Sequence, residues 1–292
     1  MLSFFRAIVI GLFQGVTELF PVSSLGHSVL IPALVGWDDL VKVQSQNESF
    51  YLAFLVALHV GTALALLVYF RAEWIKIIGG LLDSARRRRV TTPDARLGLL
   101  LIVATLPTAV VGLVFEHSLR EIFAKPAAAA IFLTINGGIL LVGERMRRQV
   151  AAGAGYGGDG FSGGRRIESL SYGEAVFIGI TQIGSLFAGI SRSGITMVGG
   201  LMRGLDHEDA ARFAFLLATP IILGAGVYKI PDLMGKLGDG IRGQALAGAA
   251  VAAVAAYIST RFLVRFFETR SLTPFGIYCL AAGSFCIVRF AF

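Results

Sequence analysis

Residues 14–27 read QGVTELFPVSSLGH, and they place polar side chains inside one of the most apolar regions of the chain. Gln14 and Glu18 are four residues apart, so a helix would present both on the same face. If this region lies in a membrane, a carboxylate there is costly and is by default a candidate functional group. We therefore expect Glu18 to take part in function.

The rest of this segment predicts a turn followed by a second helix. Pro21 is expected to end the first helix, and Ser23 and Ser24 can cap the next one. Ser24 and His27 are three residues apart and would share one face of that second helix. These groups would converge with Glu18 around one turn, although helix caps and a satisfied core histidine would account for each of them singly.

A second segment, AGISRSGITM at residues 188–197, carries the chemistry of an anion site. Gly189 and Gly194 flank Ser-Arg-Ser, and glycines let backbone N–H groups turn toward an anion. Arg192 adds a planar fork that matches phosphate oxygens, near the start of a predicted helix. Thr196 follows four residues later and can reach the same place. The pattern predicts a polyanion site; a structural ion pair between Arg192 and the carboxylate of the first segment is an alternative that does not exclude it.

The composition indicates an integral membrane protein. The 292 residues are 55% hydrophobic and 15% charged, with a mean hydropathy of +0.73. A soluble domain would carry roughly 25% charged residues. Only two cysteines are present, seven apart in one apolar run, so a disulfide framework is excluded and no metal-ligand spacing is visible.

Six runs without acidic or basic residues are each about long enough to cross a membrane as a helix. They are 49–70, 97–115, 127–143, 213–228, 243–260 and 271–288. Residues 4–36 and 172–204 are too long and too interrupted for one helix each, so we expect two re-entrant helix hairpins. The alternative is one ordinary kinked spanning helix in each place. The predicted fold class is an all-α polytopic membrane protein.

The two halves of the chain resemble each other and suggest an internal repeat. Gly-Val-Thr-Glu at 15–18 matches Gly-Ile-Thr-Gln at 179–182, and Val-Ser-x-x-Gly at 22–26 matches Ile-Ser-x-x-Gly at 190–194. We expect a first repeat at 1–150, a Gly-rich cytoplasmic linker at 151–167 and a second repeat at 168–292. One hairpin plus three spans in each half makes the second repeat inverted, and inverted repeats place a site near the membrane midplane.

The basic residues are distributed unevenly between the two sets of loops. The loops at 71–96, 145–166, 203–212 and 261–270 contain 17 Lys and Arg residues, whereas the opposite loops contain six. The positive-inside rule assigns the first set to the cytoplasm and both termini to the outside. This distribution accounts for the net charge of +7 without a nucleic-acid partner.

Taken together, the two polar segments resemble the motifs of the undecaprenyl-pyrophosphate phosphatases of the bacitracin-resistance family. That family carries Glu/Gln-x-x-x-Glu followed by Pro-Val-Ser-Ser-x-Gly-His, and a second motif, Pro-Gly-x-Ser-Arg-Ser-x-x-Thr. Residues 14–27 match the first motif, and residues 188–196 match the second. The resemblance to the family covers essentially the whole chain. Two departures are Ala188 in place of the motif's proline and Gln14, which brings no second carboxylate.

The resemblance implies an inner-membrane enzyme that removes one phosphate from undecaprenyl pyrophosphate and returns the lipid carrier to cell-wall synthesis. It also implies six spans, two re-entrant helix pairs and a divalent cation, Mg²⁺ or Ca²⁺. The expected partners are the polyprenyl pyrophosphate and membrane lipids, with a homo-oligomer left open. Access from the periplasmic side is expected.

The roles that follow from this resemblance are hypotheses. Ser24 is the candidate nucleophile, with His27 as base or as acid to the leaving group; attack by water, with Ser24 only binding, is the alternative. Glu18 and Arg192 complete the predicted catalytic group, and Glu18 is the one candidate metal ligand. The predicted substrate-binding residues are Gln14, Ser23, Gly189, Ser191, Ser193, Gly194 and Thr196. His59 is expected to be structural.

A transporter or flippase for an anionic prenyl-phosphate lipid is the competing class of function. Inverted repeats with broken helices are a transporter architecture, and an arginine-lined site could carry an anionic lipid. The two classes differ in catalysis, because a transporter releases no phosphate.

Overall fold

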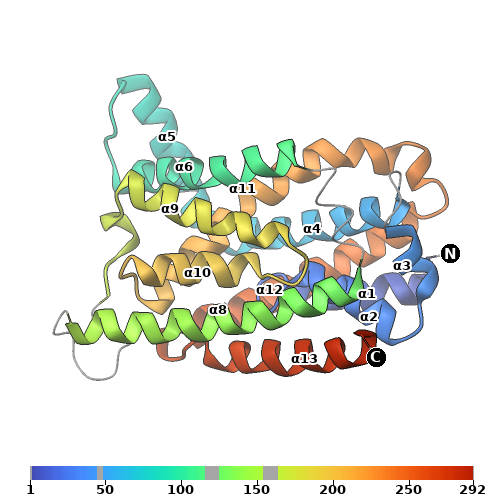
Figure 1. Ribbon diagram of the computed structural model, residues 1–292. Coiled ribbons are helices and arrows are strands. Elements are labelled where there is room, and N and C mark those ends of the chain that lie inside the picture. Colours follow the sequence, from blue (N-terminus) through green and yellow to red (C-terminus); the bar gives the residue numbers. More distant parts are fainter. Residues whose placement is uncertain (1, 45–48, 116–124, 154–163, 292) are drawn as a thin grey trace.

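In the computed structural model, the chain folds into a bundle of helices whose long members run side by side (Figure 1). The structure describes residues 2–44, 49–115, 125–153 and 164–291. Within these ranges no β-strand is present, and the one bridge between extended residues joins Arg165 to Leu205. The all-α prediction is therefore confirmed for the described part of the chain.

Among the described residues, six helices are long and apolar enough to cross a membrane, as predicted from the uncharged runs. They are α4 (Phe50–Tyr69), α6 (Pro93–Val114), α8 (Pro126–Gly153), α11 (His207–Met234), α12 (Arg242–Thr269) and α13 (Thr273–Ala291). Several extend beyond the predicted runs because a helix continues past the first charged residue until a capping group ends it. At α11, Asp206 supplies that cap by accepting the N–H of Asp209 at 2.7 Å.

Both interrupted segments are broken into two helices joined by a turn. The first pair is α1 (Phe4–Thr17) and α2 (Ser24–Leu34), and the second is α9 (Tyr172–Gln182) and α10 (Arg192–Met202), preceded by the short 3₁₀ turn η2 (Ile183–Leu186). A single kinked helix in either place is therefore wrong. The first break comes earlier than predicted, because α1 ends at Thr17, four residues before Pro21.

The same serine cap begins the second helix of each pair. The hydroxyl of Ser23 accepts the N–H of Gly26 at 3.2 Å, and the hydroxyl of Ser191 accepts the N–H of Gly194 at 3.2 Å. Each cap satisfies one of the backbone donors that a helix start leaves open. The two turns are thus built by the matched residues of the predicted repeat.

The packing also crosses between the halves of the chain. Gly15 of α1 lies against α12, where an added Cβ would meet the carbonyl oxygen of Ala252 at 2.3 Å. Its sequence match Gly179 of α9 lies against α6, where an added Cβ would meet the carbonyl oxygen of Ala104 at 2.3 Å. The missing Cβ lets each pair of helices approach closely.

In the described part of the chain, four helical elements lie outside the predicted spans and hairpins. They are α5 (Arg71–Arg87), α3 (Asp38–Gln44) and a pair of 3₁₀ turns, η1 (Ile167–Ser169) and η3 (Lys236–Gly238). The segment at 71–96, predicted as a loop between two spans, is instead helical over most of its length, since α5 ends at Arg87 and α6 begins at Pro93. Ile77 and Ser84 of α5 are buried while the opposite side is exposed, so this helix is held by one face only.

Candidate active site

The two turns meet at the carboxylate of Glu18, which follows the last residue of α1. Its Oε1 accepts a hydrogen bond from Nη2 of Arg192 at 2.6 Å, and both side chains are largely buried. Its Oε2 accepts hydrogen bonds from Nε2 of Gln14, at 3.0 Å, and from the hydroxyl of Ser24. The predicted convergence is therefore present for Gln14, Glu18 and Ser24, and the ion pair between Arg192 and Glu18 that the sequence offered as an alternative is formed as well.

The guanidinium of Arg192 is only half used by this ion pair. Nη1 is buried and has no hydrogen-bond partner in the described part of the chain. A buried charged donor without a partner costs free energy, because it has lost the water that solvated it. An anion held beside Glu18 would supply a partner for this donor, as would water in the adjoining cavity.

A cavity of about 310 Å³ opens at this point. It lies between the two turns and helices α4, α6 and α11, so both halves of the chain contribute to it. Its polar lining is formed by Glu18, Ser23, Ser24, His59, Thr108, Ser185, Ser191 and Arg192. The remaining lining is apolar, with residues such as Leu186 and Ile221, which suits a ligand that has a charged head and a hydrocarbon tail.

His59 of α4 lies at the site, although the sequence indicated a structural role for it. Its Nε2 is 3.3 Å from Oε2 of Glu18, while its Nδ1 lies 2.8 Å from the carbonyl oxygen of Leu55. The second contact orients the ring, so that Nε2 faces the carboxylate. The sequence feature that could have indicated this role is the single imidazole within an otherwise uncharged spanning run.

His27 is arranged differently from the prediction. Its Nδ1 lies 2.7 Å from the carbonyl oxygen of Ser23, and its Nε2 lies 2.7 Å from the hydroxyl of Tyr278 on α13. Both ring nitrogens are thus engaged, while the hydroxyl of Ser24 bonds to Glu18 instead. The expected pairing of His27 with Ser24 is absent from this structure.

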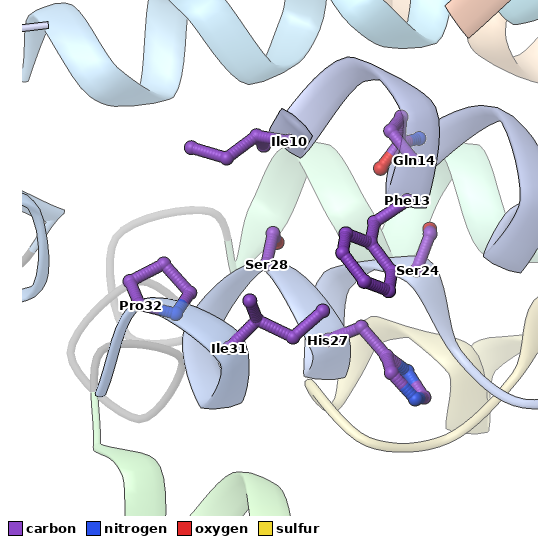
Figure 2. A pocket seen from close by; sticks show the side chains of 8 residues that line it. All are labelled: Ile10, Phe13, Gln14, Ser24, His27, Ser28, Ile31 and Pro32. Carbon is purple, nitrogen blue, oxygen red and sulfur yellow. The ribbon is translucent and has the colours of Figure 1, made fainter. Parts of the chain in front are cut away.

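Figure 2 shows the reason for this difference. The side chains of Ser24 and His27 point in different directions from α2, with Ser24 directed toward α1. The small pocket between the two helices is lined by Ile10, Phe13, Gln14, Ser24, His27, Ser28, Ile31 and Pro32. Its volume of about 10 Å³ is close to the minimum for one water molecule, so a phosphate group does not fit there.

The other predicted phosphate donors mostly connect the two turns. The N–H of Gly189 donates to the hydroxyl of Ser23 at 3.1 Å and is therefore engaged. The hydroxyl of Ser23 only accepts in this contact and in the helix cap, so its O–H can still donate to an anion in the cavity that it lines. The hydroxyls of Ser191 and Ser193 are 3.0 Å apart, and both reach the carbonyl oxygen of Phe20. The predicted anion-binding backbone is therefore a connection between hairpins, and Arg192 is left as the principal anion-binding group.

Two further predicted groups complete this comparison. The N–H of Gly194 is used by the cap on Ser191 and is likewise engaged. The hydroxyl of Thr196 is buried without a hydrogen-bond partner among the described residues, but Thr196 does not line the cavity. Thr196 is therefore placed behind the site.

Asn136 of α8 is a connecting residue that the sequence analysis did not select. Its Nδ2 donates to the carbonyl oxygen of Pro21 at 3.0 Å, and its Oδ1 accepts the N–H of Ser191 at 2.9 Å. One fully buried side chain thus holds both turns at once. Its only signal in the sequence was an amide within the uncharged run at 127–143.

The residues offer a limited set of oxygen ligands for a divalent cation. Among the described residues, no group of three or more His, Cys, Asp and Glu side chains could hold a metal ion. Glu18 is the one carboxylate at the site, and Oε1 of Gln14 is buried without a hydrogen-bond partner. Mg²⁺ is often held by one or two carboxylates with substrate phosphates and water, so Glu18 fits a cation shared with the substrate. Gln14 would join it only with its amide turned so that Oε1, in place of Nε2, faces Glu18.

The chain is similar to known proteins over nearly its whole length. A family described as "Bacitracin resistance protein BacA" matches residues 7–285. An undecaprenyl-diphosphatase of Mycolicibacterium paratuberculosis is 54% identical, and the match covers 99% of this chain and 98% of that protein. Undecaprenyl-diphosphatase 2 of Frankia alni is 51% identical with the same coverage, and the undecaprenyl-diphosphatase of Acidiphilium cryptum is 45% identical over 98% of both chains.

Proposed function

Because the chain belongs to the bacitracin resistance protein BacA family, we propose that it hydrolyses undecaprenyl pyrophosphate at the meeting point of the two turns. The products are undecaprenyl phosphate and inorganic phosphate, as the names of its relatives indicate for those proteins. The observation that carries this assignment is the unpaired Nη1 of Arg192 beside Glu18 and Ser24. The transporter alternative is not favoured by these relatives.

Arg192 would bind the pyrophosphate while keeping its ion pair. Nη2 stays with Glu18, and Nη1 is available for phosphate oxygens. Because the guanidinium is planar and fixed at one edge, little conformational entropy is lost when it binds. The same group stabilises negative charge on the transferred phosphoryl group. The prenyl tail would leave along the apolar lining of the cavity toward lipid.

Ser24 would act as the nucleophile, with Glu18 rather than His27 as its base. The hydroxyl already donates to the carboxylate, which would accept its proton as Oγ attacks the terminal phosphorus. The bond from that phosphorus to the bridging oxygen breaks, and undecaprenyl phosphate leaves with the electron pair. Water then hydrolyses the phosphoserine, giving inorganic phosphate and restoring the serine.

Direct attack by water is the competing mechanism, with Ser24 only binding. In that case Glu18 would take the proton of the water instead. Rapid quenching with radiolabelled pyrophosphate substrate separates the two: label retained on the denatured protein, and lost in Ser24→Ala, supports the serine mechanism. A protein that turns over with no retained label at any time supports attack by water.

Glu18 and Oε1 of Gln14 are the residues that would hold a divalent cation with the substrate. A bound cation would neutralise charge on the pyrophosphate oxygens. Because Gln14 donates to Glu18 through Nε2 in this structure, its Oε1 faces away, and the amide would have to turn over to bind the same cation. In that orientation it would supply an oxygen ligand without adding a second negative charge.

The hairpins would be re-entrant and related by an inverted repeat. Support comes from the matched caps Ser23 and Ser191, and from the matched glycines 15 and 179 that pack across the halves. An inverted repeat brings two broken helices together from opposite sides of a membrane. The protein would lie in the bacterial inner membrane, with the pyrophosphate reaching the site from the periplasm.

Phosphate release tests the proposal directly. Purified protein in detergent is incubated with undecaprenyl or farnesyl pyrophosphate, with Mg²⁺ and with EDTA. We expect Mg²⁺-dependent release that falls by about a hundredfold or more in Arg192→Ala, the size seen when one charge-stabilising donor is removed. Arg192→Lys is expected to recover only part of this activity, because lysine lacks the fork.

Arg289→Ala, which removes an exposed arginine of α13, is the matched control and should keep full activity. Folding of each variant is checked by its thermal unfolding. Well-folded wild-type protein that releases no phosphate would contradict the proposal and favour lipid transport, which is then measured by translocation in liposomes.

A further inference from the structure

Helix α5 carries an exposed apolar stripe that no other part of the described chain covers. Ile75, Ile78 and Leu82 are 71%, 51% and 68% exposed, and they follow the spacing that places residues on one helix face. Gly79 lies beside them, and a Cβ added there would meet nothing within 4 Å. The opposite face of α5 packs against α6. A Cβ added to Gly98 of α6 would meet side-chain atoms of Leu81 and Ile77 of α5 first.

Basic residues flank this stripe. Arg71 begins the helix, Lys76 lies beside the stripe, and Arg86 to Arg89 follow at its end, all of them exposed. The two acidic residues of the helix are already paired: Glu73 with Arg212 of α11 at 2.8 Å, and Asp83 with Arg87 at 2.8 Å. The surface of α5 is therefore both apolar and strongly cationic.

The direction of α5 matches the plane of a membrane surface. Figure 1 shows α5 at one end of the bundle, steeply inclined to the long helices and projecting beyond them. If the long helices cross the membrane, a helix inclined in this way lies along the interface and over the surrounding lipid. This segment belongs to the set of loops that contains more basic residues than the opposite set.

We propose that α5 is an interfacial helix that binds the anionic headgroups of the surrounding bilayer. Its apolar stripe would enter the region just below the headgroups, and its arginines would contact the phosphates. An amphipathic helix that combines these two features binds by apolar burial plus attraction to anionic lipid. This surface is separate from the pyrophosphate site, which lies between the two turns.

A fluorescent probe on Leu82 tests this inference. The Leu82→Cys protein is labelled with an environment-sensitive dye, since Cys279 and Cys286 are buried, and the unaltered chain is labelled in parallel to measure background. The protein is reconstituted in phosphatidylcholine vesicles with and without phosphatidylglycerol. Spin-labelled lipid then reports whether the dye touches the bilayer.

We expect a blue-shifted emission and strong quenching by spin-labelled lipid, both larger with phosphatidylglycerol. Replacing Arg86, Arg88 and Arg89 by Gln should weaken the lipid-bound state by about a hundredfold, since each basic residue near an anionic surface adds about 1 kcal/mol, which is about fivefold. The same dye on Asp239→Cys should show no dependence on phosphatidylglycerol, because the segment that joins α11 to α12 lies at the end of the bundle away from α5 (Figure 1).

Two results would overturn the inference. A dye on Leu82 that stays in water in both lipids would mean that α5 does not rest on the bilayer. A blue shift of the dye that is independent of lipid charge but grows with the protein-to-lipid ratio would mean that a second copy of the chain covers the stripe. Thermal unfolding of each labelled protein in detergent confirms that α5 is still packed on α6.

Discussion

Glu18 is a single carboxylate with several polar neighbours, and the roles of these neighbours follow from which oxygen of Glu18 each one contacts. Oε1 belongs to Arg192, while Oε2 is shared by Gln14, Ser24 and the ring of His59. A base must accept a proton and then lose it before the next turnover. Of these neighbours, the imidazole is the one that can relay a proton near neutral pH.

We predict that His59→Gln lowers kcat much more than it lowers stability. Glutamine keeps a polar group beside Glu18 but cannot carry a proton, so activity should fall at least about a hundredfold, the low end of acid–base contributions. The unfolding temperature should change little, because the His59 side chain is partly exposed to the cavity. The measurement is kcat with saturating substrate, beside thermal unfolding. Unchanged kcat would return His59 to the structural role first assigned to it.

At this scale the sequence identified the chemical groups better than their partners. Gln14, Glu18 and Ser24 converge because helix spacing and a shared turn are local properties. Arg192 reaches them from 174 positions away, because the second hairpin packs on the first. The pairing of Ser24 with Glu18 rather than His27 depends on the packing of Tyr278, which is about 250 positions away. No local pattern contains that information, and the same holds for Asn136 and both turns.

The elements of the structure depend on close contacts between helix backbones. Gly179 of α9 lies where an added Cβ would be 2.3 Å from the carbonyl oxygen of Ala104, and only movement of backbone could relieve this contact. Gly173, on the same helix, has nothing within 4 Å of that position. These two glycines therefore form a matched pair of substitution sites.

We predict that Gly179→Ala destabilises the protein by about 1–3 kcal/mol, the usual cost of overpacking. Gly173→Ala should be neutral or stabilising by up to about 1 kcal/mol, because alanine favours helix. Thermal unfolding in one mild detergent compares the two. Equal unfolding temperatures would show that α9 moves away from α6 without cost and that the contact does not fix the hairpin.

The six spans could be predicted because exclusion of charge from a membrane acts on composition, which the sequence displays directly. Helix α5 was missed for the same reason. Its charged residues interrupt every apolar run, and only Ile77 and its neighbours on one face show that a helix is held there. Counting uncharged runs detects elements surrounded by lipid and does not detect one that is half in water.

The whole molecule has two chemically different ends. Arginine-rich α5 lies at one end of the bundle, whereas both termini lie at the other end in Figure 1. Ion pairs tighten the basic end: Arg165 binds Glu174 at 2.6 Å, and Arg212 binds Glu73 at 2.8 Å. The orientation in the membrane should follow from this asymmetry, since basic loops are retained in the cytoplasm.

We predict that single cysteines at the two ends react from opposite sides of the membrane in intact cells. Arg89→Cys should be blocked by a membrane-impermeant maleimide only after the cells are opened, whereas Lys236→Cys should be blocked before. Both positions are exposed, and both native cysteines are buried, so reactivity reports the side. Labelling of Arg89→Cys from outside would reverse the orientation. The first hairpin would then enter from the cytoplasm, and access from the periplasm would have to be assigned to the second.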